Sequence, residues 1–518
     1  MITMQKDTQI FTLCTVIGSL TVNTGFSQTK PSIAGEENRK MNVLFLVSDD
    51  MRTALHVYGH QTAKTPHLDK LAHQGVLFER AYCQYPLSGP SRTSMLTGRR
   101  PTTTGIYTNR EWYGDAHPDW VSLPKYFHQK GYATLRTGKI FHSPVDDTEA
   151  WTEGGTPRNI DSLALQQISA PTTYVSPAAF YIDIQNRGLR LTPITDSQDL
   201  PGPDKWKAVE GEAANQLADT QIADQTIAYI RQSKESGQPF FIACGFRKPH
   251  TPLVAPKEFF DLYDLRDMTL PPDFASLPMI PFGFPEGSIM PFNGDMFMDR
   301  TVSPEDARDM LRAYLACVSY VDWNVGRVIA ELERQGLREN TIIIFWSDHG
   351  YQLGEKGKWS KHSSLWEHGT RVPFIIHDPR AKGNGTSSPR IVELIDIYPT
   401  LTDLCGLPQP DGLDGVSLAP LLDNPHKEWN RPAYTVTGDI GNGYNKGNGL
   451  TGVVVRTESW RYAEFFGPGA GAYLTDPVHD PHELKNLIYN PDYKDVVSEL
   501  QKLALELVAG KTVLSAPR

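Results

Sequence analysis

The architecture is set by one run of residues, Met41-Asn42-Val43-Leu44-Phe45-Leu46-Val47-Ser48-Asp49-Asp50. Its first seven residues are almost all apolar, as expected of a parallel strand that is covered on both faces. The run ends abruptly at Ser48, and two carboxylates, Asp49 and Asp50, follow at the carboxyl end of the strand. In open α/β sheets, ligands bind at that edge. The run therefore predicts an α/β protein with an acidic site at one edge of its sheet.

The paired acids can be interpreted in two ways. Neighbouring carboxylates repel one another unless a cation lies between them, which indicates calcium or magnesium, because both prefer oxygen ligands. Alternatively, Asp49 and Asp50 cap a helix in an ordinary loop. A second apolar run, Thr341-Ile342-Ile343-Ile344-Phe345-Trp346-Ser347, also ends in an acid, Asp348, followed by His349. If the two strands are neighbours, these four side chains meet, which favours the metal.

A third segment, Leu87-Ser88-Gly89-Pro90-Ser91-Arg92, supplies hydroxyl groups and a cation. Gly89 and Pro90 predict a turn, and Ser91 can cap the short helix that follows. The N-terminus of a helix favours anions, and a guanidinium group binds two oxyanion oxygens together. The segment therefore predicts an anion site that contains a nucleophile, although most serines in such turns only cap helices.

The composition limits the class of protein. The chain has 518 residues, of which 39% are hydrophobic and 21% charged, as in a soluble globular protein with one large domain and a smaller companion. The formal net charge of -10 argues against nucleic acid as a partner. No disulfide framework or zinc site is expected from the spacing of Cys14, Cys83, Cys244, Cys317 and Cys405.

The N-terminus has the features of an export signal. Lys6 precedes an apolar run from Ile10 to Val22 that is shorter than a membrane-spanning helix, and the small residues Gly25 and Ser27 suit cleavage. We expect a signal peptide over residues 1–27, a polar linker over 28–40, export to the periplasm or beyond, and no stable insertion into a membrane.

Taken together, these segments resemble the formylglycine-dependent (type I) sulfatases, whose signature is Cys or Ser followed by x-Pro-x-Arg. Ser88 occupies the first position of that signature and Arg92 the last. The flanks of both acidic runs are similar to the iduronate-2-sulfatase-like subfamily. A serine in place of cysteine implies a bacterial chain and, as its partner, a sulfatase-maturating enzyme that accepts serine.

The resemblance implies roles for three residues near other strand ends. Gly138-Lys139-Ile140-Phe141-His142 matches the family's Gly-Lys-x-x-His, so Lys139 is expected to bind sulfate and His142 to contact the formylglycine oxygen. His250, in Arg247-Lys248-Pro249-His250, corresponds to the general acid that faces the leaving group. From the residues alone, a surface lysine, a structural histidine and an exposed histidine are the ordinary interpretations.

The family's second sulfate-binding lysine aligns with the loop that follows the second acidic run. Lys361 fits best by count, and Lys356 or Lys358 would replace it if the register were shifted. Arg92 completes the set of cations around sulfate. Most lysines in loops are simply solvated.

The resemblance also implies a cofactor and a mechanism. Ser88 is oxidised to 3-oxoalanine (formylglycine), and its hydrate attacks the sulfur of the ester. One calcium ion per chain withdraws charge from the sulfate oxygens. The expected calcium ligands are Asp49, Asp50, Ser88, Asp348 and His349. Whether His349 binds the ion or supports its ligands is left open.

The fold implied is an alkaline-phosphatase-like sandwich, in which helices flank a large mixed, mostly parallel sheet. We expect this catalytic domain over residues 41–428. Short β-like runs after residue 432 and a final helix from about Tyr493 to Val508 predict a small antiparallel α+β subdomain over 429–518. The insertions at 143–212 and 271–299 lack periodicity and are expected to wall the pocket.

The expected substrate is a sulfate ester on a sugar of a sulfated polysaccharide or its oligosaccharides. The subfamily implies exo action on a 2-O-sulfated uronic acid, and related enzymes act on algal glycans such as ulvan or carrageenan. Two rivals remain. A phosphatase or phosphodiesterase of the same superfold would use unmodified serine and two zinc ions, with His362, Glu367 and His368 as extra ligands. The other rival is an exported glycan-binding protein with a decayed site.

Overall fold

The computed structural model describes residues 40–142, 145–155, 206–298, 300–438, 449–467 and 469–509. These residues belong to one compact unit, Lys40–Arg518. The expected signal peptide, nearly all of the linker, and most of the insertion at 143–212 lie outside the described residues. The strands are β1 Asn42–Asp49, β2 Val76–Tyr82, β3 Ala133–Gly138, β4 Trp206–Val209, β5 Phe240–Pro249, β6 Leu253–Pro256, β7 Thr341–Ser347, β8 Arg371–Val372, β9 Phe374–His377, β10 Thr386–Glu393, β11 Ala433–Gly438, β12 Leu450–Arg456, β13 Arg461–Phe465 and β14 Gly471–Thr475.

Helices connect and cover these strands. The α-helices are α1 Pro66–Gln74, α2 Ser88–Thr97, α3 Pro101–Thr104, α4 Tyr113–Ala116, α5 Leu123–Gln129, α8 Glu212–Asn215, α9 Ala218–Ser236, α10 Lys257–Phe260, α11 Pro304–Arg334, α12 Glu367–Thr370, α13 Ile397–Leu404, α14 Ala419–Asp423 and α15 Lys494–Val508. Short 3-10 helices are η1 His56–Tyr58, η2 Thr148–Ala150, η3 Leu265–Asp267, η4 Glu286–Ser288, η5 Arg338–Asn340, η6 Leu394–Asp396 and η7 Pro491–Tyr493.

An eight-stranded sheet forms the centre of the unit, in the order β10-β2-β9-β7-β1-β5-β3, with β8 paired to β2. Strand β1 is parallel to both β7 and β5, and β3 is parallel to β5. Strand β9 is antiparallel to β7 and to β2. The expected α/β class, with a large, mixed and mostly parallel sheet, is confirmed.

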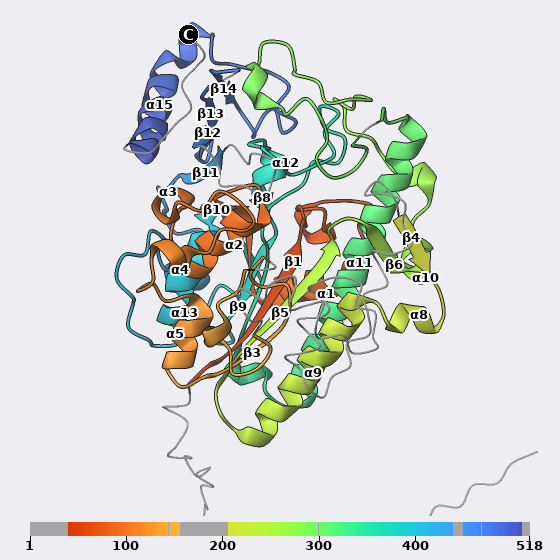
Figure 1. Cartoon of the computed structure of the whole chain (residues 1–518), viewed down its shortest axis with the longest axis vertical. Coiled ribbons are helices and arrows are strands. Elements are labelled where there is room, and N and C mark those ends of the chain that lie inside the picture. The colour runs from red at the N-terminus through yellow and green to blue at the C-terminus, as the bar shows by residue number, and fades with distance from the viewer. Residues whose placement is uncertain are drawn as a thin grey trace, which may run out of the picture. The chain divides into compact units, whose positions relative to one another are not determined.

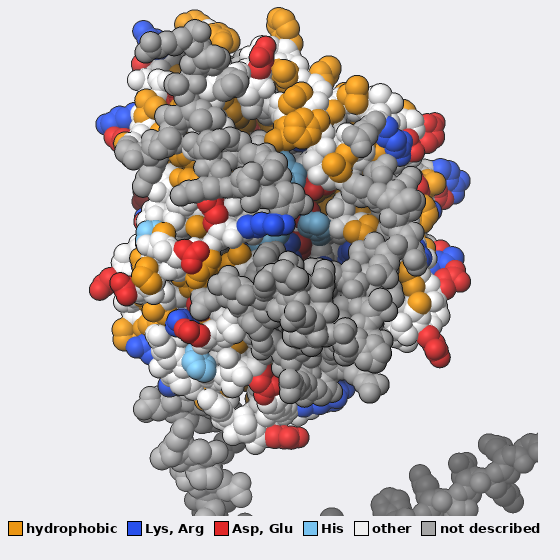
Figure 2. All heavy atoms as spheres, viewed as in Figure 1, with side chains coloured by type: hydrophobic (Ala, Val, Ile, Leu, Met, Phe, Trp, Pro, Cys, Tyr) orange, Lys and Arg blue, Asp and Glu red, His pale blue; other side chains and the backbone are white. Residues whose placement is uncertain are grey.

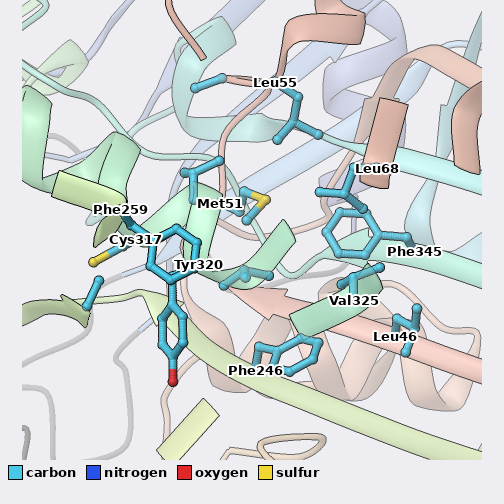
Figure 3. Close-up of a cluster of buried hydrophobic side chains, with 14 of the residues drawn as sticks. Leu46, Met51, Leu55, Leu68, Phe246, Phe259, Cys317, Tyr320, Val325 and Phe345 are labelled. Carbon is cyan, nitrogen blue, oxygen red and sulfur yellow. The ribbon is translucent and has the colours of Figure 1, made fainter. Parts of the chain in front are cut away.

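Both faces of this sheet are covered, which explains the continuous apolar run of β1. Leu44 and Leu46 pack with side chains of α1, α9 and α11, and Figure 3 shows part of this cluster. Val43, Phe45 and Val47 point to the other face and pack with α2, α5 and α13. Figure 1 shows α9 and α11 on one side of β1 and β5, with α2, α5 and α13 on the other.

The C-terminal part contains a second sheet, antiparallel and four-stranded, in the order β11-β12-β13-β14. Leu500, Ala504 and Val508 of α15 pack on it beside Val453 and Val455 of β12. The expected small antiparallel sheet with one covering helix is thus present. Its fourth strand, β14, is short and was not predicted, because Gly471-Ala472 offers little β signal.

Among the described residues, no helix combines the length and the apolar character that crossing a lipid bilayer requires.

Candidate active site at the carboxyl edge of the sheet

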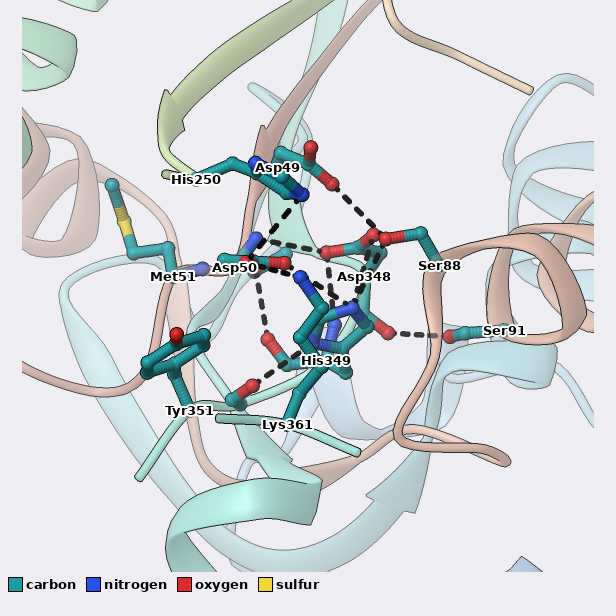
Figure 4. Close-up of polar contacts among 12 residues, drawn as sticks. Asp49, Asp50, Met51, Ser88, Ser91, His250, Asp348, His349, Tyr351 and Lys361 are labelled. Carbon is teal, nitrogen blue, oxygen red and sulfur yellow. Dashed lines mark hydrogen bonds and ion pairs between the residues drawn. The ribbon is translucent and has the colours of Figure 1, made fainter. Parts of the chain in front are cut away.

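The acidic ends of β1 and β7 lie side by side, as the sequence pattern predicts. The two strands are parallel and in register at Ser48 and Ser347, so Asp49 and Asp348 follow at the same level of the sheet. The Asp50 amide donates a hydrogen bond to Asp348 Oδ1 at 3.1 Å, which joins the two strand ends (Figure 4). All three carboxylates are at most 2% exposed.

Helix α2 presents Ser88 to these carboxylates. Ser88 is the first residue of the helix, and its Oγ lies 3.3 Å from Asp49 Oδ1 and 3.1 Å from His349 Nε2. The prediction that Ser91 caps the helix is wrong. The helix begins three residues earlier, at Ser88, so Ser91 lies within the first turn and donates its hydroxyl hydrogen to the Asp348 carbonyl instead.

Arg92 is fully buried behind the carboxylates. Its Nε donates to Asp348 Oδ2 and its Nη2 to Asp49 Oδ1, each at 3.0 Å. Its Nη1 donates to the backbone carbonyls of Lys139 and Ile140 at 2.6 and 3.0 Å. The guanidinium group therefore fixes the relative position of the two acids and of the chain that carries Lys139.

Two lysines face the acids from different segments. Lys139 Nζ donates to Asp49 Oδ2 at 2.5 Å, and Lys361 Nζ donates to Asp50 Oδ2 at 2.7 Å. The alternatives to Lys361 point elsewhere: Lys356 Nζ pairs with Asp273 at 2.9 Å, and Lys358 Nζ donates to the Phe292 carbonyl at 2.7 Å.

These cations control the charge of the acids. Burial alone would raise the pKa of Asp49, but Lys139 and Arg92 hold that pKa well below its ordinary value. Burial opposes the charge of Lys361, yet Asp295 and Asp50 raise the pKa of Lys361 above its ordinary value. Asp49 therefore stays ionised and Lys361 stays protonated at neutral pH, whereas burial lowers the pKa of Lys139.

Two histidines border the acids. His250 follows β5, with its Nε2 3.9 Å from Asp50 Oδ2 and its side chain 34% exposed. Its Nδ1 lies 2.6 Å from the Thr251 carbonyl, so Nδ1 carries the hydrogen and Nε2 faces the site. His142 is held by the Asn109 carbonyl, 3.1 Å from its Nδ1. Burial lowers the pKa of both histidines.

The donors at this point suit a divalent cation. Ligand atoms of Asp50, Asp348 and His349 all lie within 4.8 Å of one another, as do those of Asp49, Asp50 and His250. Asp50 Oδ1 is buried without a hydrogen-bond donor in the described part of the chain. His349 Nδ1 lies 2.9 Å from the Gly350 carbonyl, which leaves the Nε2 lone pair for the site. Carboxylate oxygens are the ligands that calcium and magnesium prefer.

Figure 2, in the same view as Figure 1, shows the surface near this edge. Histidine and basic side chains gather near the middle of the face, just above the place where β1 is labelled in Figure 1. Hydrophobic side chains gather above them. The exposed large hydrophobic residues of the chain include several in the insertion at 271–299, namely Leu277, Met279, Ile280, Phe282, Phe292 and Met298.

A family model described as Sulfatase matches residues 41–407, most of the chain. The chain belongs to the sulfatase family. A second model, N-sulphoglucosamine sulphohydrolase, C-terminal, matches residues 354–509 of this sulfatase. The protein is therefore a sulfuric ester hydrolase, and the rival interpretation as a glycan-binding protein is set aside.

Individual relatives agree with the family match. The sulfatase is 32% identical to a protein named Sulfatase from Formosa agariphila, over 90% of this chain and 87% of the relative. It is also 32% identical to iduronate 2-sulfatase from Homo sapiens, over 76% and 74% of the two chains. A crystal structure of phosphonate monoester hydrolase of Agrobacterium radiobacter covers 91% of this chain and 96% of its own, with a TM-score of 0.68 and 23% identity, and shares the fold.

The extra zinc ligands of the phosphatase rival lie elsewhere in this sulfatase. His362 faces Asp295, His368 faces Glu355, and Glu367 binds Arg456 and Arg461. None of the three belongs to the two groups of possible metal ligands among the described residues, Asp49-Asp50-His250 and Asp50-Asp348-His349, which we call the metal-type groups. In the described part of the chain, the two groups of possible metal donors share Asp50 and lie at the carboxyl ends of β1, β5 and β7.

Sequence reasoning missed two polar residues of the site. Asn109 Oδ1 accepts the Gly89 N–H at 2.8 Å while its carbonyl holds His142, so Asn109 ties the start of α2 to that histidine. Asp295 lies beside Lys361, with its Oδ1 3.4 Å from Lys361 Nζ. Both residues belong to irregular loops, where no periodicity or motif indicates which side chain turns toward the sheet edge.

Proposed function

We propose that this sulfatase removes sulfate from a sugar residue of a sulfated polysaccharide or its oligosaccharides, after oxidation of Ser88 to formylglycine. One observation carries the proposal: Ser88, the first residue of the Ser-x-Pro-x-Arg signature, begins α2 and lies against Asp49 and His349. Oxidation would supply an aldehyde that adds water, and one hydroxyl group of this hydrate would attack sulfur and displace the sugar oxygen. The serine-accepting maturation enzyme is the partner that this chemistry requires.

A calcium ion is the proposed metal. Asp50 Oδ1, which has no hydrogen-bond donor among the described residues, the three buried carboxylates and the Nε2 of His349 fit such an ion. When bound, calcium withdraws charge from the sulfate oxygens and makes sulfur more electrophilic. The residues that would hold it are Asp49, Asp50, Ser88, Asp348 and His349.

The remaining residues position sulfate and the leaving group. Lys139 contacts Asp49 and Lys361 contacts Asp50, so the two ammonium groups flank the pair of acids. From these positions they can bind sulfate oxygens. Arg92 supports the site by holding the acids in place, because its observed hydrogen bonds go to Asp49, Asp348 and backbone carbonyls.

Two histidines supply and hold protons in this scheme. The Nδ1–H of His250 is engaged by the Thr251 carbonyl, so the proton for the departing sugar oxygen would be a second one, carried on Nε2 in the imidazolium form. His142, held by Asn109, is proposed to contact the oxygen of the modified residue 88.

The similarity to iduronate 2-sulfatase supports a 2-O-sulfated uronic acid at the end of a chain as the substrate. The equally similar protein from Formosa agariphila is named only as a sulfatase. A further relative from that organism, 26% identical over 90% of this chain, is named Ulvan-active sulfatase, so we retain algal glycans such as ulvan or carrageenan as the second substrate class. Export to the periplasm, directed by residues 1–27, would bring the enzyme to such polymers.

Mass analysis of the tryptic peptide Ala81–Arg92 tests this proposal. The active protein, produced with a serine-accepting maturation enzyme, should carry a residue 88 that has lost two hydrogen atoms relative to serine. Ser88→Ala should abolish release of sulfate. Ser94→Ala is the matched control, because Ser94 lies in the same helix and its hydroxyl has no hydrogen-bond partner among the described residues.

Unmodified Ser88 in fully active protein would contradict the proposal and support the phosphatase alternative. A screen of defined sulfated oligosaccharides for released sulfate then identifies the sugar. Release from 2-O-sulfated uronic acids at chain ends supports the first substrate class. Release only from algal glycans supports the second.

A further inference from the structure

Asp295 lies in the insertion at 271–299 and is buried against a segment some 65 residues further along the chain. Its Oδ2 accepts the Ser360 hydroxyl at 2.8 Å. Its Oδ1 lies 3.4 Å from both Lys361 Nζ and His362 Nε2. One carboxylate therefore contacts the side chains of three consecutive residues, with the middle one, Lys361, pointing at the metal-type site.

The two segments are joined on both sides of this contact. Asn293 Oδ1 accepts the Trp359 N–H at 2.8 Å, and the Met296 N–H donates to the Trp359 carbonyl at 3.4 Å. The rings of Phe297 and Trp359 meet edge to face at 5.2 Å. The backbone around Asp295 is thus fixed relative to the backbone around Lys361, which makes the carboxylate a rigid partner for the ammonium group.

Lys361 has two acidic partners, Asp50 and Asp295, and only Asp50 also belongs to a metal-type group. Asp50 Oδ2 accepts a hydrogen bond from Lys361 Nζ at 2.7 Å, but Asp50 also offers its other oxygen, without a hydrogen-bond donor among the described residues, toward the metal-type group. A divalent cation would compete with Lys361 for the charge of Asp50. Asp295 is in neither metal-type group of the described residues, so its charge stays available to Lys361.

We propose that Asp295 is a positioning residue, which holds the Lys361 ammonium group aimed at the sulfate while Asp50 serves the metal. This inference rests on the proposed function, in which Lys361 binds sulfate. Asp295 itself carries a negative charge and would repel the anion, so its effect passes through Lys361. Removal of the charge should therefore weaken the binding of sulfate and leave the binding of calcium unchanged.

Calorimetry with inorganic sulfate and, separately, with calcium tests this on the full-length protein. Asp295→Asn keeps the size of the side chain and removes its charge, and it should raise the Kd for sulfate about tenfold while the Kd for calcium changes less than twofold. KM for an aryl sulfate should rise in parallel. Asp295→Glu should restore most of the affinity, because it returns a carboxylate to the same loop.

The matched control is Asp273→Asn. Asp273 belongs to the same insertion and pairs with Lys356 at 2.9 Å, in a contact of the same kind that does not reach Asp50. This variant should bind sulfate as the wild type does. If Asp295→Asn does not fold, Asp295→Glu and Ser360→Ala carry the test, because the first keeps the charge and the second removes only the 2.8 Å hydrogen bond.

Three outcomes would overturn the inference. Unchanged sulfate affinity in Asp295→Asn contradicts this inference and leaves the proposed function intact. An equal loss of sulfate and calcium affinity shows a general structural role instead. A wild-type protein that binds calcium but not sulfate contradicts the proposed function, and this inference with it; the mass of the Ala81–Arg92 peptide then tells whether residue 88 was oxidised.

Discussion

Asp50 has an unusual backbone conformation for a residue with a side chain. Its φ is 63°, in the left-handed region that non-glycine residues rarely adopt. Its amide donates to Asp348 Oδ1, and its carbonyl accepts the Tyr314 hydroxyl hydrogen at 2.8 Å. The surrounding structure therefore imposes a conformation that costs about 1–3 kcal/mol, and this conformation turns Asp50 Oδ1 into the metal-type site.

Asp50→Asn separates this conformation from the charge of the side chain. Asparagine tolerates positive φ better than most residues, so the variant should fold. We expect it to lose the calcium-induced rise in melting temperature that a specific ligand gives the wild type, and to lose activity at least about 100-fold. Thermal unfolding with and without calcium measures the first effect.

The control for this prediction is Asp261→Asn, which removes an exposed carboxylate that pairs with Lys257. Its melting temperature should rise with calcium as in the wild type. A calcium-dependent rise of equal size in Asp50→Asn would show that Asp50 is not a metal ligand.

The site residues differ in how well a sequence predicts them. Asp49 and Asp348 end apolar strands, and parallel pairing brings such strand ends together, so their meeting could be predicted. Lys139, His142, His250 and Lys361 were found by resemblance alone. Asp295 and Asn109 could not be found, because their positions depend on how two irregular loops fold against distant segments.

At the scale of elements, the start of α1 shows a similar dependence on distant residues. Thr65 precedes the helix but its side chain does not cap it. Asp322 of α11 does so instead: its Oδ1 accepts the Leu68 N–H at 2.7 Å and its Oδ2 the His67 N–H at 3.3 Å. Burial raises the pKa of Asp322 to about 7, against the effect of these hydrogen bonds.

This pKa predicts a pH-dependent stability. The folded-state value lies above the ordinary 3.8, so the contribution of Asp322 to stability is full below about pH 4 and is lost as the pH rises through about 7. Asp322→Asn stays neutral throughout. Relative to the wild type, its free energy of unfolding should therefore improve by roughly 1–3 kcal/mol between pH 5 and pH 8.

Urea unfolding of both proteins at the two pH values measures this change. A difference between wild type and Asp322→Asn that stays constant with pH would contradict the assignment.

Strands β2 and β10 could not be predicted from the sequence, because their hydrophobic pattern is not that of a buried strand. Strands β2 and β10 lie toward one edge of the large sheet and mix charged with apolar residues, as in Val76-Leu77-Phe78-Glu79-Arg80. Such runs lack the continuous apolar character of β1, β5 and β7. Strands β8 and β9 are separated by Pro373, which has no N–H for the ladder.

At the scale of the whole molecule, Glu367 connects the two sheets. It lies in α12, beside the large sheet, where its Oε1 accepts the Tyr82 hydroxyl hydrogen at 2.8 Å. Its Oε2 lies 3.3 Å from Arg456 Nε of β12 and 2.5 Å from Arg461 Nη2 of β13. Burial alone would raise the pKa of Glu367, but the two arginines hold it well below the ordinary 4.5.

Glu367→Gln should destabilise the protein by about 3–5 kcal/mol, because it removes the buried counter-charge of Arg456 and leaves Arg461 with Glu483 as its remaining acidic partner. The wild-type contribution is present above pH about 4.5 and is lost only as the pH falls through the depressed pKa, so the effect should be full at pH 7. Thermal unfolding at pH 7 measures the loss. Glu458→Gln, at a more exposed pair with Arg390, is the control and should change stability little. Equal stability of Glu367→Gln and the wild type would contradict the connecting role.

The central claim is that the acidic ends of β1 and β7 hold one divalent cation against residue 88. A crystal structure of the oxidised protein grown with calcium, with anomalous scattering to locate the ion, tests this most directly. We predict a single peak with oxygens of Asp49, Asp50 and Asp348 at about 2.3–2.6 Å and the side chain of residue 88 beside it. Two metal peaks, or a calcium ion bound away from these carboxylates, would contradict the account.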